Sequence, residues 1–166
     1  MQTTLKFDTL NYREMKTYLF AVVFVLGNIL LPQLCHLVPN GGFVWLPIYF
    51  FTLIGAYKYG WQVGLLTAVA SPLLNSWLFG MPPTGVLPII LVKSVALALA
   101  AALVAKRAQT VTILTMVLVV VAYQLVGSIF EWVYTGSLAA ALQDVRIGIP
   151  GLLLQVVGGY LILKKI

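Results

Sequence analysis

Long hydrophobic runs, separated by short polar or Gly/Pro-rich segments, dominate this chain. Six such runs lie at about residues 17–37, 43–57, 59–79, 86–105, 110–134 and 147–163. A bilayer core about 30 Å thick needs about 20 apolar residues per helix, so the second run is short for a full crossing. The pattern predicts six short transmembrane helices, preceded by a polar lead-in at residues 1–16.

The composition supports a membrane protein. Hydrophobic residues make up 61% of the chain and charged residues 8%, whereas soluble domains carry about 25% charged residues. We therefore predict an all-α integral membrane protein in which residues 17–166 form one six-helix bundle. The formal charge is +6, but the basic residues form no patch with interleaved aromatic residues, so no nucleic-acid partner is expected.

The basic residues also predict an orientation. With six spans, only Arg146 falls on one side of the membrane, and Lys93 lies inside a span. The other basic residues fall on the opposite side: Lys6, Arg13, Lys16, Lys58, Lys106, Arg107, Lys164 and Lys165. The positive-inside rule places this side, with both termini, in the cytoplasm.

Lys93 is the ionisable residue inside the fourth run, and it shares a helical face with small residues such as Ala96 and Ala100. Small residues favour close contact between membrane helices. An ionisable side chain on such a face indicates a ligand site with a partner to be found. The alternative is that Lys93 snorkels to the surface or only staples two helices together.

Polar residues at helical spacing run along the third and fifth spans. Gly64, Thr67, Ser71 and Asn75 form one stripe, and Gln124, Ser128, Glu131 and Thr135 form the other. Most such residues act as hydrogen-bonding contacts between helices. Glu131, however, lies at nearly the depth of Lys93, roughly 8 Å from the outer end of its span.

We therefore predict a substrate site that contains Lys93 and Glu131. The full predicted set is Lys93, Glu131, Gln124, Asn75, Tyr123, Tyr134, Trp132, Trp45, Gln155 and Arg146. A buried lysine stays charged when a negative group lies near it. The expected ligand is a small molecule with an acidic group for Lys93, a donor or cation for Glu131, and an apolar body between them.

No catalytic motif is present: there is no P-loop, no HExxH and no Ser/His/Asp set. We predict that the chain is not an enzyme and cannot itself hydrolyse ATP. Cys35 and His36 are adjacent, but structural zinc needs about four ligands, so no metal site is expected.

Residues 46–88, LPIYFFTLIGAYKYGWQVGLLTAVASPLLNSWLFGMPPTGVLP, combine a helix, a tight Tyr-Lys-Tyr-Gly turn, a Gly-containing third helix and a Gly/Pro loop. With six short spans over the whole chain, this resembles the substrate-binding S components of bacterial energy-coupling factor (ECF) vitamin transporters. The resemblance implies high-affinity binding of a small water-soluble vitamin or precursor at the bacterial cytoplasmic (inner) membrane.

The same resemblance implies partners. S components dock on a transmembrane T component driven by two ATPase subunits, which use the ATP, so no cofactor is expected in this chain. Docking involves an Ala-x-x-x-Ala face on the first helix; here Thr17 and Ala21 occupy that spacing, followed by Val25. Two other classes stay open: a stand-alone small secondary transporter, and a structural membrane protein in which Lys93 and Glu131 form a staple.

Overall fold

The computed structural model describes residues 3–4 and 9–166, and it is almost entirely α-helical. Counted over these residues, four helices are long and apolar enough to cross a membrane. They are α1 (Met15–Cys35), α4 (Trp61–Phe79), α5 (Leu87–Ala108) and α6 (Ile113–Thr135). They closely match the first, third, fourth and fifth predicted spans, which confirms the all-α class. The predicted lead-in, 1–16, lies partly outside the described residues.

Local signals account for the ends of these helices. Thr112 caps α6 by accepting a hydrogen bond from the Thr115 backbone N–H at 3.1 Å, and the Thr115 side chain accepts one from the Thr112 N–H at 3.0 Å. This reciprocal arrangement is a capping box. Helix α4 ends at Gly80 (φ 66°) and α6 at Gly136 (φ 67°), a left-handed conformation that glycine adopts readily.

The second and sixth predicted spans are broken into shorter helices. The second consists of α2 (Gly41–Trp45), η1 (Pro47–Tyr49) and α3 (Phe50–Tyr59). The break falls at Leu46, whose φ is 45° and ψ 47°, next to Pro47, which has no N–H to continue the α2 helix. The ten residues of α3 rise only about 15 Å, half the thickness of a bilayer core.

The predicted loop at residues 135–146 and the sixth predicted span are also divided. The loop forms two short helices, α7 (Leu138–Ala141) and α8 (Gln143–Arg146). The following segment runs through α9 (Ile149–Leu153), the π-helical η2 (Leu154–Gly158) and α10 (Gly159–Lys165). Single π-helical turns inside helices are frequent at functional sites.

Helix α3 occupies the centre of the bundle. All residues from Thr52 to Lys58 are buried, and α3 packs against both α4 and α5. Small residues permit this close packing: a Cβ added at Gly64 would lie 2.5 Å from the Ala56 Cβ and 3.1 Å from the Ala98 Cβ. Close contact through small residues is the usual way in which helices associate in membranes.

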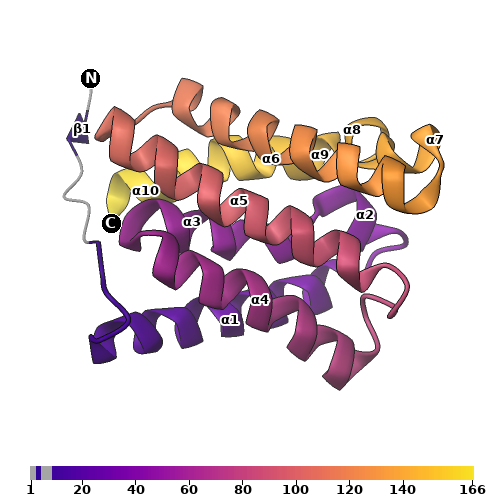
Figure 1. Cartoon of the computed structure of the whole chain (residues 1–166), viewed down its shortest axis with the longest axis horizontal. Coiled ribbons are helices and arrows are strands. Elements are labelled where there is room, and N and C mark those ends of the chain that lie inside the picture. The colour runs from indigo at the N-terminus through magenta and orange to yellow at the C-terminus, as the bar shows by residue number, and fades with distance from the viewer. Residues whose placement is uncertain (1–2, 5–8) are drawn as a thin grey trace.

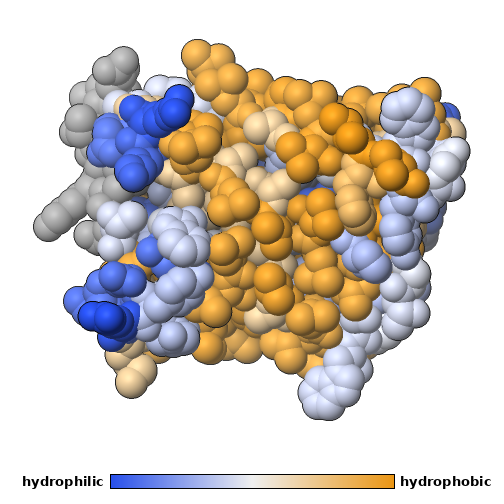
Figure 2. Space-filling view, in the orientation of Figure 1, coloured by the Kyte–Doolittle hydropathy of each residue, from blue (hydrophilic) through white to orange (hydrophobic). Residues whose placement is uncertain are grey.

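The two ends of the bundle differ in charge. Strand β1 (Thr3–Thr4) pairs antiparallel with β2 (Thr110–Val111), and it lies at the same end as the C-terminus, opposite α2, α7 and α8 (Figure 1). Lys106 and Arg107 end α5, and Lys164 and Lys165 end α10. Figure 2 shows a hydrophobic band across the middle of one face and the most hydrophilic surface at the β1 end.

Candidate functional site

Lys93 lies on α5 against α6, and a glycine on α6 makes room for it. The lysine is only 3% exposed. A Cβ added at Gly127 would overlap the Lys93 Cγ, and it would lie within 3.2 Å of the Lys93 Cε and Cδ. The aliphatic part of Lys93 therefore crosses α6 at the position where that helix has no side chain.

The ammonium group of Lys93 is held between two carboxylates. Its Nζ lies 2.6 Å from Glu131 Oε2 and 2.8 Å from Asp144 Oδ2. Glu131 is four residues after Gly127, hence about one helical turn further along the same face of α6. The side chains of Glu131 and Asp144 are 12% and 13% exposed. Lys93 and Glu131, which the sequence places at nearly the same depth, are thus in direct contact, and Asp144 of α8 completes what we call the charged cluster (Lys93, Glu131, Asp144).

Asp144 reaches the bundle because the short helices between α6 and η2 pack tightly. A Cβ added at Gly148 would lie 2.6 Å from the Asp144 carbonyl oxygen and 2.8 Å from Leu46 Cδ1. A Cβ added at Gly151 would lie 2.5 Å from the Trp45 carbonyl oxygen. These two glycines let α9 lie against the end of α2, and α8 adjoins α9.

A chain of buried polar groups continues from the charged cluster toward η2. The Gln124 Nε2 group donates to Asp144 Oδ2 at 3.4 Å and to the Tyr123 hydroxyl at 3.1 Å. The Tyr123 hydroxyl in turn donates to Gln155 Oε1 at 2.9 Å. Gln155 belongs to the π-helical segment. We call Gln124, Tyr123 and Gln155 the polar chain; the Tyr49 ring lies beside it, 5.5 Å from that of Tyr123 between centroids.

The polar chain is incompletely satisfied. Among the described residues, Gln124 Oε1 and Gln155 Nε2 have no hydrogen-bond partner, although Gln124 is 6% and Gln155 0% exposed. A buried polar atom without a partner costs about 1–3 kcal/mol. These atoms are therefore places where a ligand could supply a hydrogen bond.

The structure places Asn75 in a different cluster. Its Nδ2 group donates to the backbone carbonyls of Asn28 at 3.0 Å and Ser71 at 2.9 Å. The Asn28 side chain donates to Thr52 Oγ1 and Ser71 Oγ, and it accepts a hydrogen bond from the Phe51 N–H. This Asn28 cluster (Asn28, Thr52, Ser71, Asn75) joins α1, α3 and α4, so Asn75 does not accompany Lys93.

The remaining predicted site residues are exposed. Trp45, Trp132 and Tyr134 are 40%, 51% and 51% exposed, and Tyr134 stacks on Phe130 with centroids 5.8 Å apart. Arg146 is exposed and, within the described part of the chain, forms no ion pair. The structure thus unites five of the ten predicted residues: Lys93, Glu131, Gln124, Tyr123 and Gln155.

The two residues of the predicted docking face are buried. Thr17 is 0% exposed, and its hydroxyl donates to the Asn11 carbonyl at 2.5 Å. Ala21 is 5% exposed, and it lines an apolar groove of about 330 Å³ between α1 and α4. Thr17 therefore faces the protein interior, whereas Ala21 adjoins a surface groove.

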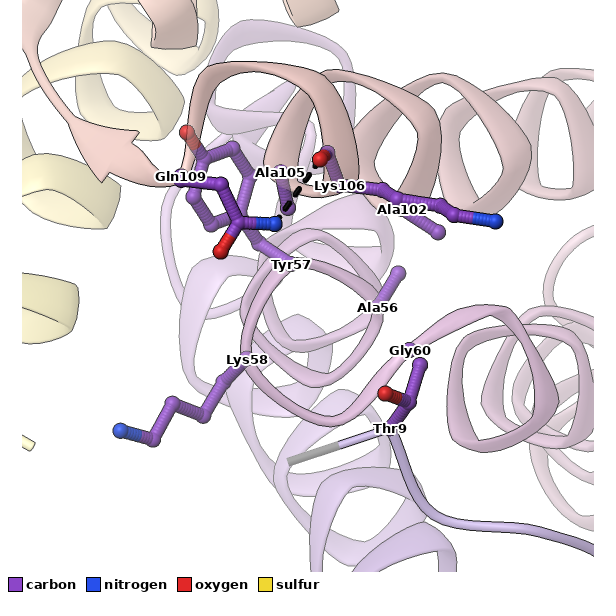
Figure 3. A pocket seen from close by; sticks show the side chains of 9 residues that line it. All are labelled: Thr9, Ala56, Tyr57, Lys58, Gly60, Ala102, Ala105, Lys106 and Gln109. Atoms are coloured by element: carbon purple, nitrogen blue, oxygen red, sulfur yellow. Dashed lines mark hydrogen bonds between the residues drawn. The ribbon is translucent and has the colours of Figure 1, made fainter. Parts of the chain in front are cut away.

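A second pocket, of about 280 Å³, lies at the β1 end of the bundle. Lys58 and Lys106 line it, but Figure 3 shows that their side chains point in opposite directions. Lys58 Nζ donates to the Ile166 carbonyl at 3.0 Å. None of the buried unpartnered polar atoms found among the described residues belongs to this pocket, so the charged cluster is the stronger candidate.

Asp144 is the residue that sequence reasoning missed as a partner of Lys93, because it lies in a predicted loop. The sequence nevertheless contained an indication that Asp144 could pair with Lys93. The chain has four acidic residues, and Asp8 and Glu14 precede the first span. On the predicted outer side, Asp144 is therefore the one carboxylate besides Glu131. Its proximity to Lys93 depends on how α8 folds back, which spacing along the chain does not predict.

Comparisons with protein-family models, curated proteins and solved structures find no match to this chain. The resemblance to S components stays a prediction, and the charged cluster and the polar chain are the features of the molecule that bear on its function.

Proposed function

We propose that this chain is the substrate-binding subunit of a bacterial membrane uptake system for a small water-soluble nutrient, such as a vitamin or its precursor. The observation that carries the proposal is Lys93, buried between Glu131 and Asp144 in a bundle of apolar helices. Lipid cannot satisfy such groups, and an ionisable residue inside a membrane bundle marks a functional site by default.

The chemistry of the site favours binding over catalysis. An ammonium paired with two carboxylates is not a nucleophile, and a covalent mechanism needs a nucleophile activated by a neighbouring base. The charged cluster and the polar chain instead hold hydrogen-bond donors and acceptors beside the buried rings of Tyr123 and Tyr49. Ligand sites combine such apolar walls with a few placed polar groups.

The decisive test is native mass spectrometry of the protein purified from bacterial membranes. The expected result is a population that carries one small molecule and loses it on collisional heating. The triple variant Lys93→Met/Glu131→Gln/Asp144→Asn removes the charges and retains similar volumes, so it should fold and carry nothing. A wild-type protein that carries no small molecule under any extraction condition would refute the proposal.

We further propose that the chain crosses the membrane six times, with both termini in the cytoplasm. The broken segments η1–α3 and α9–α10 would then be the two short crossings, and the basic ends of α5 and α10 would lie inside, as the positive-inside rule requires. Cysteines introduced into a Cys35→Ser background test this. In intact cells, a membrane-impermeant maleimide should label Ala139→Cys but not Gln109→Cys. The reverse labelling pattern would show that both termini lie outside the cell.

Energy for uptake would come from partners: an ECF T component and two ATPase subunits. This part of the proposal rests on the sequence resemblance alone. Affinity purification of the chain from its native membrane should recover these subunits. Uptake by the chain alone in proteoliposomes would instead support a stand-alone transporter.

A further inference from the structure

The charged cluster contains more negative than positive charge. One ammonium faces two carboxylates, so the cluster carries a formal charge of −1. Arg146 is exposed and forms no ion pair with any described residue, so it does not neutralise Asp144. An uncompensated charge is costly where water is scarce. The cluster is therefore suited to receive a positive group.

The carboxylates keep oxygens available for such a group. Lys93 contacts Glu131 Oε2 and Asp144 Oδ2. Within the described residues, no hydrogen bond reaches Glu131 Oε1 or Asp144 Oδ1. An incoming anion, by contrast, would have to displace one of the carboxylates from Lys93.

A second, independent observation points to a ligand at the same place. Gln124 is more than nine-tenths buried, and its Nε2 group is directed at Asp144 Oδ2. Its Oε1 atom has no partner among the described residues. This atom is an additional acceptor beside the two carboxylates, and the Tyr123 ring lies on the adjacent residue of α6.

We propose that the charged cluster and Gln124 bind a small organic cation, such as an amine, an amidine or a protonated ring nitrogen. Its N–H groups would donate to the free carboxylate oxygens and to Gln124 Oε1. This inference rests on the proposed function, and it reverses the charge expected from the sequence, because two carboxylates already satisfy Lys93.

Three probes of similar shape and different charge test the inference: benzamidine (+1), benzamide (neutral) and benzoate (−1). Binding to the purified protein in detergent is measured by calorimetry and by the shift in melting temperature. Hydrogen bonds to charged groups contribute about 1.5–3 kcal/mol, so benzamidine should bind at least about tenfold more tightly than benzamide. Benzoate should not bind.

Two variants locate the effect. Glu131→Gln and Asp144→Asn each leave Lys93 one carboxylate and make the cluster neutral, so both should fold and lose the preference for benzamidine. Arg146→Gln, which changes a charge two residues from Asp144, is the matched control and should bind like wild type. Unchanged benzamidine binding in both carboxylate variants would overturn the inference.

Other outcomes are equally decisive. Benzoate binding that strengthens in Asp144→Asn would mean that the ligand's own carboxylate takes the place of Asp144, which would overturn the inference. The absence of benzamidine binding to the wild-type protein would also overturn it. The two proposals fail separately. An anionic small molecule retained in native mass spectrometry would refute the cationic ligand and leave the proposed binding function standing. The absence of any retained small molecule would refute the binding function itself.

Discussion

Two buried polar clusters lie in the same bundle, and they differ in charge and in hydrogen bonding. In the Asn28 cluster, the Asn28 side chain makes three hydrogen bonds, to Thr52, Ser71 and the Phe51 backbone. In the charged cluster, two carboxylates share one lysine, and the adjoining polar chain has two atoms without partners among the described residues, Gln124 Oε1 and Gln155 Nε2.

This difference shows that burial of polar groups does not by itself indicate a binding site. The Asn28 cluster is neutral, and apart from Asn75 Oδ1 its side-chain groups find partners within the described protein. It joins three helices, as interhelical hydrogen bonds in membranes commonly do. Excess charge is what distinguishes the charged cluster, since atoms without a partner occur both in the adjoining polar chain and at Asn75. An excess of negative charge is a property that a ligand can correct.

The largest expected effect follows from Lys93→Ala, which leaves Glu131 and Asp144 side by side without a cation. Removal of one partner from a buried ion pair typically destabilises a protein by 3–5 kcal/mol, so we expect a loss of about that size in the free energy of unfolding, measured by denaturant titration in mixed micelles. A loss below about 1 kcal/mol would show that water reaches the cluster freely.

The triple variant Lys93→Met/Glu131→Gln/Asp144→Asn separates stability from function. Replacement of a whole buried ionic group by neutral residues is often neutral or stabilising. The triple variant should therefore recover most of the stability that Lys93→Ala loses and still bind no ligand. Recovery of both stability and ligand binding would mean that the charged cluster only holds the helices together.

The next largest effect is expected for Gly127→Ala. The added Cβ overlaps the Lys93 Cγ, and overpacking typically costs about 1–3 kcal/mol. The displaced lysine should also weaken ligand retention. Gly85→Ala is the matched control, because a Cβ there meets no atom within 4 Å and the backbone needs no special conformation; equal effects of the two substitutions would contradict the proposed packing of Lys93 over α6.

Asn28→Ala tests the other cluster. It removes three hydrogen bonds, and with about 0.6 kcal/mol for each such bond in membranes we expect the free energy of unfolding to fall by about 2 kcal/mol. At temperatures where the variant is folded, ligand retention should equal that of wild type. Loss of the ligand from folded Asn28→Ala would remove the distinction between the two clusters.

The sequence predicted the long helices and the matched depth of Lys93 and Glu131 because both depend on short-range regularities. Long runs of high mean hydropathy define α1, α4, α5 and α6. The equal depth of Lys93 and Glu131, measured from one membrane face, follows from the rise per residue of an α-helix. The same reasoning failed for Asn75, because depth does not indicate which neighbour a helix face meets. Ser71 and Asn75 contact Asn28 of α1. Gly64 packs against Ala56 of α3 and Ala98 of α5 rather than against Lys93.

The break at Leu46 and the position of Asp144 depend on tertiary contacts. Leu46 adopts a left-handed backbone conformation that leucine seldom takes, and its side chain packs beside Gly148. Asp144 reaches Lys93 because α9 folds against this end of α2 and α8 adjoins α9. No local pattern predicts such a contact, although the glycines at 148 and 151 were visible in the sequence.

The smallest expected effect concerns the polar chain, through Tyr123→Phe. The Tyr123 hydroxyl links Gln124 to Gln155, so its removal takes away two hydrogen bonds and should lower the free energy of unfolding by about 1 kcal/mol. Tyr134→Phe is the control: Tyr134 is 51% exposed, and its variant should match wild type.

The effect of Tyr123→Phe on the ligand should exceed its effect on stability. Without the hydroxyl, the Gln124 amide loses one of its two contacts, so its free Oε1 atom is no longer held beside Asp144. We expect the affinity for benzamidine to fall about three- to tenfold, within the 0.5–1.5 kcal/mol that one intramolecular hydrogen bond contributes. The benzamide affinity should change less, because the main partner of the cation is the pair of carboxylates. If Tyr123→Phe lowers stability and leaves the affinity for benzamidine untouched, the polar chain is a packing contact like the Asn28 cluster, and the binding site is limited to Lys93, Glu131 and Asp144.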